Sequence, residues 1–106
     1  MIKRWHRGWR VVREFLQRGS RGWAPSDTWS LDHYLAGVMG ASLVHLAEHS
    51  HGWPGPDSEW ASEAAWTEEL KTHARVLREY STDWEGKVEV APNLHRLATI
   101  WGHLWD

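Results

Sequence analysis

Residues 28–50, TWSLDHYLAGVMGASLVHLAEHS, contain the pattern that decides the fold. Apolar side chains recur there at steps of three or four residues and cover a broad helix face: Leu31, Tyr34, Leu35, Val38, Met39, Leu43 and Leu46. Gly37 and Gly40 lower the helix propensity of this segment, but they would let a neighbouring helix approach closely. We therefore expect a central helix that packs against several others.

Clear signals mark both ends of this helix. Before it, Ser26 and Asp27 can accept hydrogen bonds from the backbone N–H groups that a first helical turn leaves free. After it, HGWPGP at residues 51–56 combines glycine and proline, which end helices. The sequence predicts a helix from about residue 28 to residue 49 or 50.

Three further helices are predicted around the central one. Residues 2–18 form an amphipathic pattern that ends at Gly19, a third pattern runs from near residue 57 to about residue 81, and Pro92 suits the first turn of a last helix. Residues 87–90, KVEV, alternate like a strand but have no strand partner, so we interpret them as a loop. The predicted fold is all-α, a small helical bundle of about four helices in one domain over residues 1–106.

The composition indicates a cytoplasmic protein with unusually many indoles. There is no cysteine, which excludes disulfides and thiolate metal sites. No apolar run reaches the roughly 18 residues of a membrane span, and no signal-peptide pattern is present. Ten tryptophans stand beside two tyrosines and one phenylalanine, and ten indoles are hard to bury in one small domain. We expect some of them to line a surface, a groove or a subunit contact.

Charge is distributed unevenly along the chain. Seven of the twelve basic residues, but one of the fourteen acidic residues, lie within residues 1–22, so this segment carries +6 and the rest −8. The segment could grip nucleic acid, lie on an anionic membrane, or pack its tryptophan face into the core with its arginines in solvent. We expect the third arrangement, and the net acidic charge of the whole chain argues against nucleic acid as the main partner.

His45-Leu46-Ala47-Glu48-His49 is the clearest metal-binding pattern. Two histidines four residues apart share a helix face and could reach one zinc ion, with His51 as a third ligand. The H-x-x-E-H pattern is that of inverzincin metallopeptidases, which are far larger than this chain. A chance match is unsurprising in a chain with eight histidines. We therefore expect no metal and no other cofactor, and keep His45 and His49 as secondary candidates.

A candidate ligand site surrounds the predicted start of the central helix. Backbone N–H groups at a helix start and arginine are the usual ingredients of an anion site, and indole can stack a base. Asp32 and His33 could be half of an acid–base pair, but no nucleophile elbow, phosphate loop or carboxylate pair accompanies them. The candidate ligand-binding residues are Arg18, Arg21, Trp23, Asp27, Trp29, Asp32, His33, His51 and Trp53.

Two blocks of this sequence carry a family resemblance. The first combines Arg21-Gly22-Trp23 with DTWSLDHYLA at residues 27–36, and the second is HGWP at residues 51–54. They resemble a family of small uncharacterised proteins encoded by tailed bacteriophages, and WGHLWD at residues 101–106 is similar to that family's C-terminal end. The resemblance covers residues 18–54 well and the last helix loosely. It implies a phage origin, with expression in the host cytoplasm, and implies no activity.

The lack of a catalytic constellation favours binding over catalysis. We expect a non-enzymatic phage protein, and our first hypothesis is an anti-defence factor that sequesters a nucleotide-like anionic ligand. A protein-interaction module is one alternative, in which exposed tryptophans form a homo-oligomeric or host-protein contact. A small metal-binding protein based on histidine is the other.

Overall fold

Four α-helices and two 3₁₀-helices make up the protein. The computed structural model describes residues 2–50 and 52–105, and for residues 2–7 the backbone alone. Along the chain lie α1 (Ile2–Arg21), η1 (Pro25–Ser30), α2 (Leu31–His49), α3 (Glu63–Ser81), α4 (Ala91–Thr99) and η2 (Trp101–His103). The described residues contain no strand, and residues 87–90 form a loop as predicted. The predicted all-α fold is confirmed.

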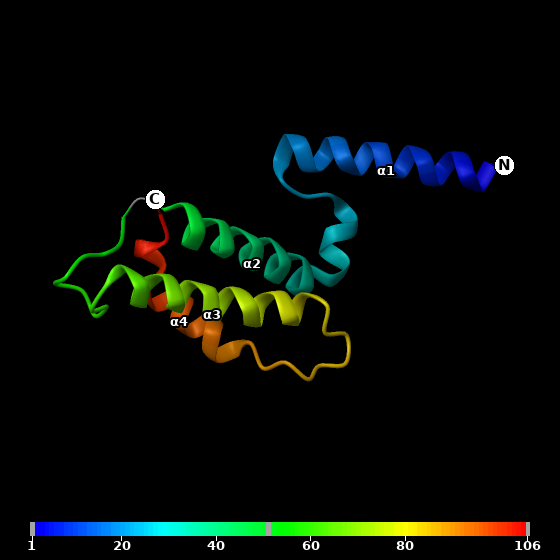
Figure 1. Ribbon diagram of the computed structural model, residues 1–106. Helices are drawn as coiled ribbons and strands as arrows, with labels where there is room; N and C mark the ends of the chain where they lie inside the picture. The colour runs from blue at the N-terminus through cyan, green and yellow to red at the C-terminus, as the bar shows by residue number, and fades with distance from the viewer. Residues whose placement is uncertain (1, 51, 106) are drawn as a thin grey trace.

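An antiparallel pair, α2 and α3, forms the centre of the fold (Figure 1). The buried residues of α2 are Ala36, Gly40, Leu43 and Ala47, most of them small. A Cβ atom on Gly40 would lie 2.6 Å from Cγ of Arg78 and 3.1 Å from the carbonyl oxygen of Ala74, so only glycine fits this crossing without a shift. The prediction that a glycine of this helix admits a close neighbour is confirmed at Gly40.

The buried face of α2 differs from the predicted one. Leu31, Leu35 and Val38, which we expected in the core, are 45%, 46% and 47% exposed. Large aliphatic side chains would hold two helix axes apart, whereas the small residues of α2 let α3 approach closely. Close packing therefore selects the small face of α2 and leaves these three side chains about half exposed.

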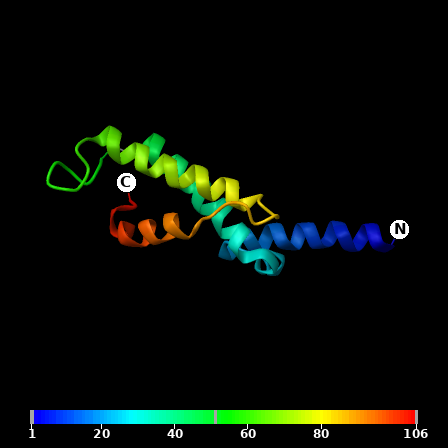
Figure 2. The ribbon, with the colours of Figure 1, turned by 90° about the horizontal axis from the view of Figure 1, so that it is seen from below.

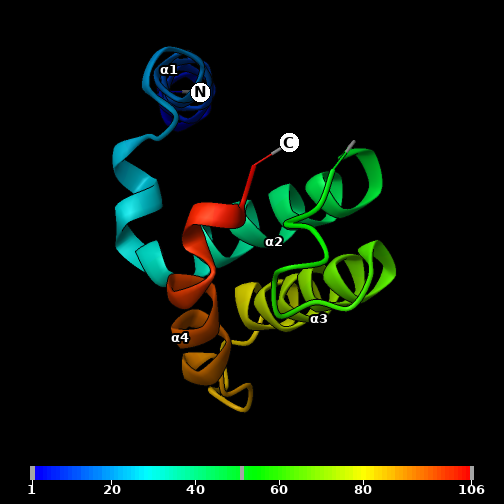
Figure 3. The ribbon, with the colours of Figure 1, turned by 90° about the vertical axis from the view of Figure 1, so that its left-hand side faces the viewer.

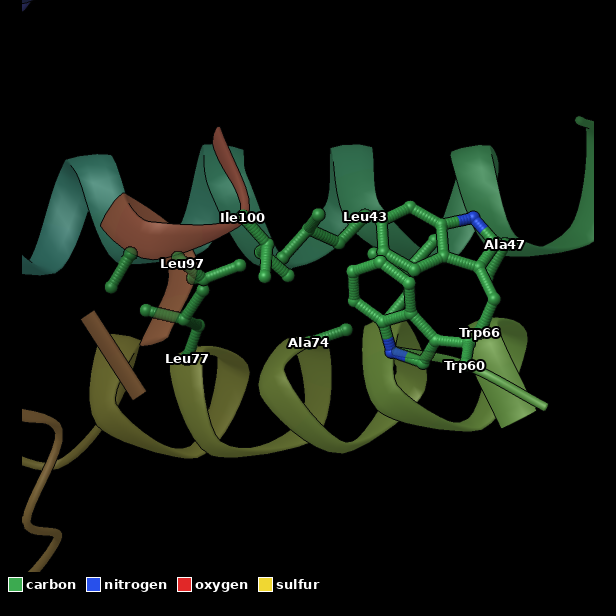
Figure 4. Close-up of a cluster of buried hydrophobic side chains, with 10 residues drawn as sticks. Leu43, Ala47, Trp60, Trp66, Ala74, Leu77, Leu97 and Ile100 are labelled. Carbon is green, nitrogen blue, oxygen red and sulfur yellow. The ribbon is translucent and has the colours of Figure 1, made fainter. Parts of the chain in front are cut away.

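The core is completed by α4 and by the segment before α3. Figure 4 shows Leu97 and Ile100 pointing into the space between α2 and α3, beside Leu43 and Leu77. At the other end of the core, the rings of Trp60 and Trp66 meet edge to face with their centroids 4.5 Å apart. The buried cluster consists of Ala36, Leu43, Ala47, Trp60, Trp66, Leu70, Ala74, Leu77, Leu97 and Ile100.

A charged cluster joins α4 to α3 at the edge of this core. The guanidinium of Arg96 donates to the carboxylate of Glu69, with Nε 3.0 Å from Oε1 and Nη2 2.8 Å from Oε1. The indole N–H of Trp60 also donates to Glu69, at 3.4 Å, and Arg96 pairs with Glu59 at 2.8 Å. Hydrogen bonding from Arg96 lowers the pKa of Glu69, so this carboxylate stays charged and holds the two helices together.

The first helix, α1, lies outside the core. Figures 2 and 3 show α1 extending away from the other helices and joined to them through η1. The molecule is accordingly elongated, with principal extents of 62 × 31 × 18 Å. The protein is thus a three-helix body with a projecting fourth helix. The expectation that the tryptophan face of residues 2–18 packs into the core is wrong for the described side chains, because Trp9, Val12 and Leu16 are exposed.

Helix ends also differ from the predicted ones. The first helix continues past Gly19 to Arg21, and Gly22 follows it with a φ of +86°, a conformation that suits glycine. Residues 25–30 form η1, so α2 begins three residues later than expected. The third helix begins at Glu63, where Ser62 accepts a hydrogen bond from the backbone N–H of Ala65. No helix among the described residues is both long and apolar enough to cross a bilayer.

Candidate functional site

The structure divides the predicted ligand site between two ends of α2. Trp53 follows the end of α2, which has 19 residues and is therefore about 28 Å long. His51 lies outside the described residues. The other predicted residues lie near the start of α2: Arg18, Arg21, Trp23, Asp27, Trp29, Asp32 and His33.

Arg18 is neutralised within the chain. Its Nε donates to Oδ2 of Asp27 at 2.9 Å and its Nη2 donates to Oδ1 at 2.7 Å. Asp27 also accepts the backbone N–H of Ala24 at 2.8 Å, so it stabilises the start of η1 and not, as predicted, the start of α2. The hydrogen bond from Arg18 lowers the pKa of Asp27. A guanidinium held by a carboxylate in this way has little capacity left for a ligand anion.

Arg21 and Trp23 shape the turn between α1 and η1. The Nε of Arg21 donates to the carbonyl oxygen of Trp23 at 3.0 Å, and its guanidinium lies 4.0 Å from the centroid of the Trp23 ring. The hydroxyl of Tyr34 in α2 donates to the carbonyl oxygen of Gly22 at 2.6 Å. These contacts fix the turn against α2, so both predicted site residues have a structural role here.

His33 lies in an aromatic stack between α2 and the end of α3. Its ring centroid is 4.1 Å from that of Trp84 and 5.0 Å from that of Tyr80. Its Nδ1 is 3.1 Å from Oδ1 of Asp32, and its Nε2 is 3.2 Å from the carbonyl oxygen of Asp83. The hydroxyl of Tyr80 donates to Asp32 at 2.6 Å, which lowers the pKa of Asp32 and raises that of Tyr80. No serine, threonine or cysteine is among these hydrogen-bond partners of His33.

An open depression lies beside this stack. It has a volume of about 360 Å³, and two tryptophans that are about 70% exposed, Trp29 and Trp84, line it together with Ser26, Ser30 and Ser81. Such a surface could stack a planar ring. Arg18 is bound to Asp27 and Arg21 to the turn. The two guanidinium groups expected to receive an anion are therefore already engaged.

His45 and His49 stack on each other, with ring centroids 4.2 Å apart. The Nδ1 of His49 is 3.0 Å from the carbonyl oxygen of His45, which orients the ring along the helix. Among the described side chains, residues 8–50 and 52–105, no three histidine, aspartate or glutamate groups gather around one point that could hold a metal. His51, the third ligand considered above, lies outside those residues.

The sequence interpretation also misplaced the apolar side of α1. Four side chains along one side of this helix are exposed: Trp9 (61%), Val12 (48%), Phe15 (73%) and Leu16 (61%). We call these four residues the outer face of α1. They recur at helical spacing, so they form one continuous stripe.

The body contacts the opposite, polar side of α1. Glu14 and Gln17 are the half-buried residues of α1 between residues 8 and 21, and the rest of that stretch is exposed. Arg10 lies over the ring of Trp29, 5.4 Å from its centroid, and Arg18 is bound to Asp27. Glu14 lies between Arg10 and Arg18, 3.5 Å and 3.7 Å away, and its side chain is 14% exposed. The helix is therefore attached by its polar side, and its apolar side faces solvent.

The expectation that the core cannot absorb all the indoles is confirmed for the nine described tryptophans. Trp60 and Trp66 are buried, and Trp53 is half-buried. The other six are exposed: Trp9, Trp23, Trp29, Trp84, Trp101 and Trp105. They are spread over both ends of the molecule, so they form several surfaces and not one patch.

Searches of protein families, curated proteins and solved structures give no match to this chain.

Proposed function

We propose that this chain is a non-enzymatic binding protein that attaches to an anionic membrane surface through α1. One observation carries the proposal: the body holds α1 by its polar side and leaves the outer face, Trp9, Val12, Phe15 and Leu16, in solvent. An amphipathic helix with tryptophan and phenylalanine on one face and arginine on the other is typical of helices that lie in a bilayer interface.

The charge on α1 supports a lipid partner. Residues 1–22 carry +6, and their one acidic residue, Glu14, faces the body between two arginines. The side of α1 that faces away from the body is thus apolar in the middle and cationic at the edge, where Arg13 is exposed. Each basic residue near an anionic bilayer contributes about 1 kcal/mol, and each large apolar side chain buried in it contributes about 1.5–3 kcal/mol.

A second copy of the chain is a less suitable partner for the same face. Trp9, Val12 and Leu16 have the spacing of a coiled-coil seam, but indole is too large for the usual knobs-into-holes packing. The positions that flank such a seam are Gly8, Arg13, Phe15 and Ser20, and none of them carries an acid that could pair with an arginine of the other helix. Two α1 helices would bring like charges together.

Vesicle co-sedimentation tests the proposal. Vesicles of phosphatidylethanolamine with a low or a high fraction of phosphatidylglycerol separate the apolar contribution to binding from the charge contribution. Leu16→Glu is compared with Val11→Glu, because both side chains are 61% exposed and both changes add one negative charge to α1. The two positions are about 140° apart around the helix, so Val11 lies at the edge of the outer face, beside Phe15, whereas Leu16 lies close to Trp9 and Val12 near its middle. We expect vesicle binding to rise with the anionic lipid fraction. We also expect Leu16→Glu to lower the affinity for vesicles at least tenfold more than Val11→Glu does.

Two results would overturn this proposal. One is equal binding of the two glutamate variants, since the apolar stripe would then contribute nothing. The other is no vesicle binding together with concentration-dependent self-association that Leu16→Glu abolishes, which would assign the outer face to a second copy. A lower unfolding temperature for monomeric Leu16→Glu alone would mean that the face packs against its own body.

The cellular setting is part of the same proposal. The resemblance of residues 18–54 to small phage proteins supports expression in a bacterial host, where α1 would meet the anionic cytoplasmic leaflet. A protein held there could intercept host defence components that act at the membrane. No residue is assigned a catalytic role in this function.

Capture of a nucleotide-like ligand is the second candidate function. The depression lined by Trp29 and Trp84 favours it, because exposed indoles stack bases. Titration of tryptophan fluorescence with a panel of nucleotides and cyclic oligonucleotides tests it, with Trp84→Leu compared with Trp101→Leu, which lies outside the depression. Saturable quenching that Trp84→Leu removes would support this function, and an unchanged signal across the panel would reject it.

A further inference from the structure

A small aromatic cavity lies at the other end of the molecule, away from α1. It has a volume of about 90 Å³ and is lined by Gly52, Trp53, Pro54, Trp66, His103 and Trp105. Three segments that are distant in sequence form it: the turn after α2, the first turn of α3 and the residues at the end of η2. Trp66 is 2% exposed, Trp53 is half-buried and Trp105 is 72% exposed, so the cavity has a fixed inner wall and an accessible outer one.

We propose that this cavity binds a methylated ammonium group. Three indoles line it, and the face of an indole attracts a cation through its quadrupole. Aromatic enclosures of this kind are suited to quaternary ammonium groups, because the attraction needs no hydrogen-bond partner.

The chemistry of the lining distinguishes this ligand from other ions. Among the residues that the structure describes, no lysine or arginine lines the cavity, so an anion would find no positive partner there. No carboxylate of the described residues lines it either, so an ammonium or guanidinium group would find no charged acceptor for its N–H donors. Methylation removes those donors and leaves the charge. The charge of −8 outside residues 1–22 also favours a cation over an anion.

The size of the cavity limits the ligand further. At about 90 Å³ it is smaller than the engineered cavity of about 150 Å³ that accepts benzene in another protein. A nucleobase is larger than benzene and does not fit this limit, whereas a trimethylammonium head is about the size of benzene and would fill the cavity and reach its open side at Trp105. Trp53, which we predicted as part of an anion site, therefore belongs to a site of the opposite charge preference.

Calorimetric titration of the full chain with choline tests this inference. The control ligand is 3,3-dimethylbutan-1-ol, which has the shape of choline with carbon in place of the charged nitrogen. Sodium chloride at equal ionic strength controls for screening. We expect saturable binding of choline and at least tenfold weaker binding of the neutral alcohol. Nε-trimethyllysine in the same titration distinguishes a methylated side chain from a free choline-like solute.

Tryptophan variants identify the site. Trp105→Leu removes one exposed wall and is expected to weaken choline binding roughly tenfold. Trp53→Leu is expected to do the same, with its thermal unfolding measured in parallel because this side chain is half-buried. Trp84→Leu, at the other end of the molecule, should leave binding unchanged.

Equal affinity for choline and its neutral analogue would overturn the inference and leave a plain apolar cavity. Absence of saturable choline binding, or binding that Trp105→Leu leaves unaltered, would overturn it as well. Vesicle binding through α1 does not depend on these results.

Discussion

Asp27 accepts hydrogen bonds from both Nε and Nη2 of Arg18, at 2.9 Å and 2.7 Å, and this ion pair attaches α1 to the rest of the molecule. The two residues are nine positions apart and lie on either side of the turn at Gly22. Asp27 belongs to η1, which continues directly into α2. The orientation of α1 therefore depends on this ion pair, on Arg10 over the ring of Trp29, and on the hydrogen bonds of Arg21 and Tyr34 at the turn.

Asp27→Asn is expected to loosen α1 without unfolding the body. The amide keeps the size of the side chain but loses the charge that holds the guanidinium of Arg18. Hydrogen exchange should become faster in residues 18–24, and the unfolding temperature of the α2–α3–α4 core should change little. Asp57→Asn, at an exposed position, is the control. Unchanged exchange in residues 18–24 would show that the ion pair does not hold α1.

Gly40→Ala and Gly37→Ala should change stability in opposite directions. Alanine is better than glycine in a helix by about 1 kcal/mol, so each change begins with the same gain. At Gly40 the new Cβ would lie within 3.2 Å of two backbone atoms of α3, the Ala74 oxygen and the Arg78 nitrogen, whereas at Gly37 its nearest neighbour is Cβ of Ser81 at 3.6 Å. Overpacking costs about 1–3 kcal/mol, so Gly40→Ala should lower the free energy of unfolding and Gly37→Ala should raise it.

Denaturant unfolding of both variants checks this prediction. A gain in stability for Gly40→Ala would mean that α2 and α3 are farther apart than the structure shows.

The sequence predicts the helices well because each one carries its own signals. Trp66, Leu70, His73 and Leu77 recur at helical spacing and are all buried in α3. Pro92 lies in the first turn of α4, as expected from its fixed φ and missing N–H. Residues at the ends of the segments were harder to place, because Gly19 and Gly22 are equally good stop signals in the sequence.

The periodicity of the sequence does not determine which face of a helix packs against another helix. On α2, the line of Leu31, Leu35 and Val38 is more apolar than the face that packs, but α3 selects the face that allows the closest approach. On α1, periodicity predicts an apolar stripe correctly but says nothing about what covers it. The attachment of α1 by its polar side depends on Asp27 and Trp29, which lie in another element and could not be paired with it from spacing.

The candidate site was predicted only in part, because contacts between elements that are far apart in sequence cannot be inferred from spacing within one element. The stack of His33 with Tyr80 and Trp84 joins positions about 50 residues apart, so no local sequence pattern could predict it. Grouping Trp53 with Arg18 assumed that both ends of a 19-residue helix could serve one site.

Glu69→Gln should lower stability at neutral pH and flatten its dependence on acid. Hydrogen bonds from Arg96 lower the pKa of Glu69 below its ordinary value of 4.5. The ion pair therefore contributes fully above about pH 4.5 and is lost as the pH falls through the lowered pKa. Removing it should reduce the free energy of unfolding by about 1–2 kcal/mol at pH 7.

Unfolding measured from pH 7 to pH 3 checks this prediction for Glu69→Gln and for Glu68→Gln, its exposed neighbour. The difference in the free energy of unfolding between wild type and Glu69→Gln should disappear as the pH falls. A gap that stays constant over this range would show that the charge of Glu69 does not contribute.

Trp66→Ala and Trp84→Ala remove the same side chain from opposite environments. Trp66 is 2% exposed and packs against Trp60, so its loss leaves a cavity and should cost about 3–5 kcal/mol. Trp84 is 70% exposed and stacks on His33, so its loss should cost about 1 kcal/mol or less. Acrylamide quenching separates the two indoles, because the Trp84 variant should lose a quenchable component and the Trp66 variant a protected one. Comparable losses of stability would mean that the segment after α3 packs more tightly than its exposure indicates.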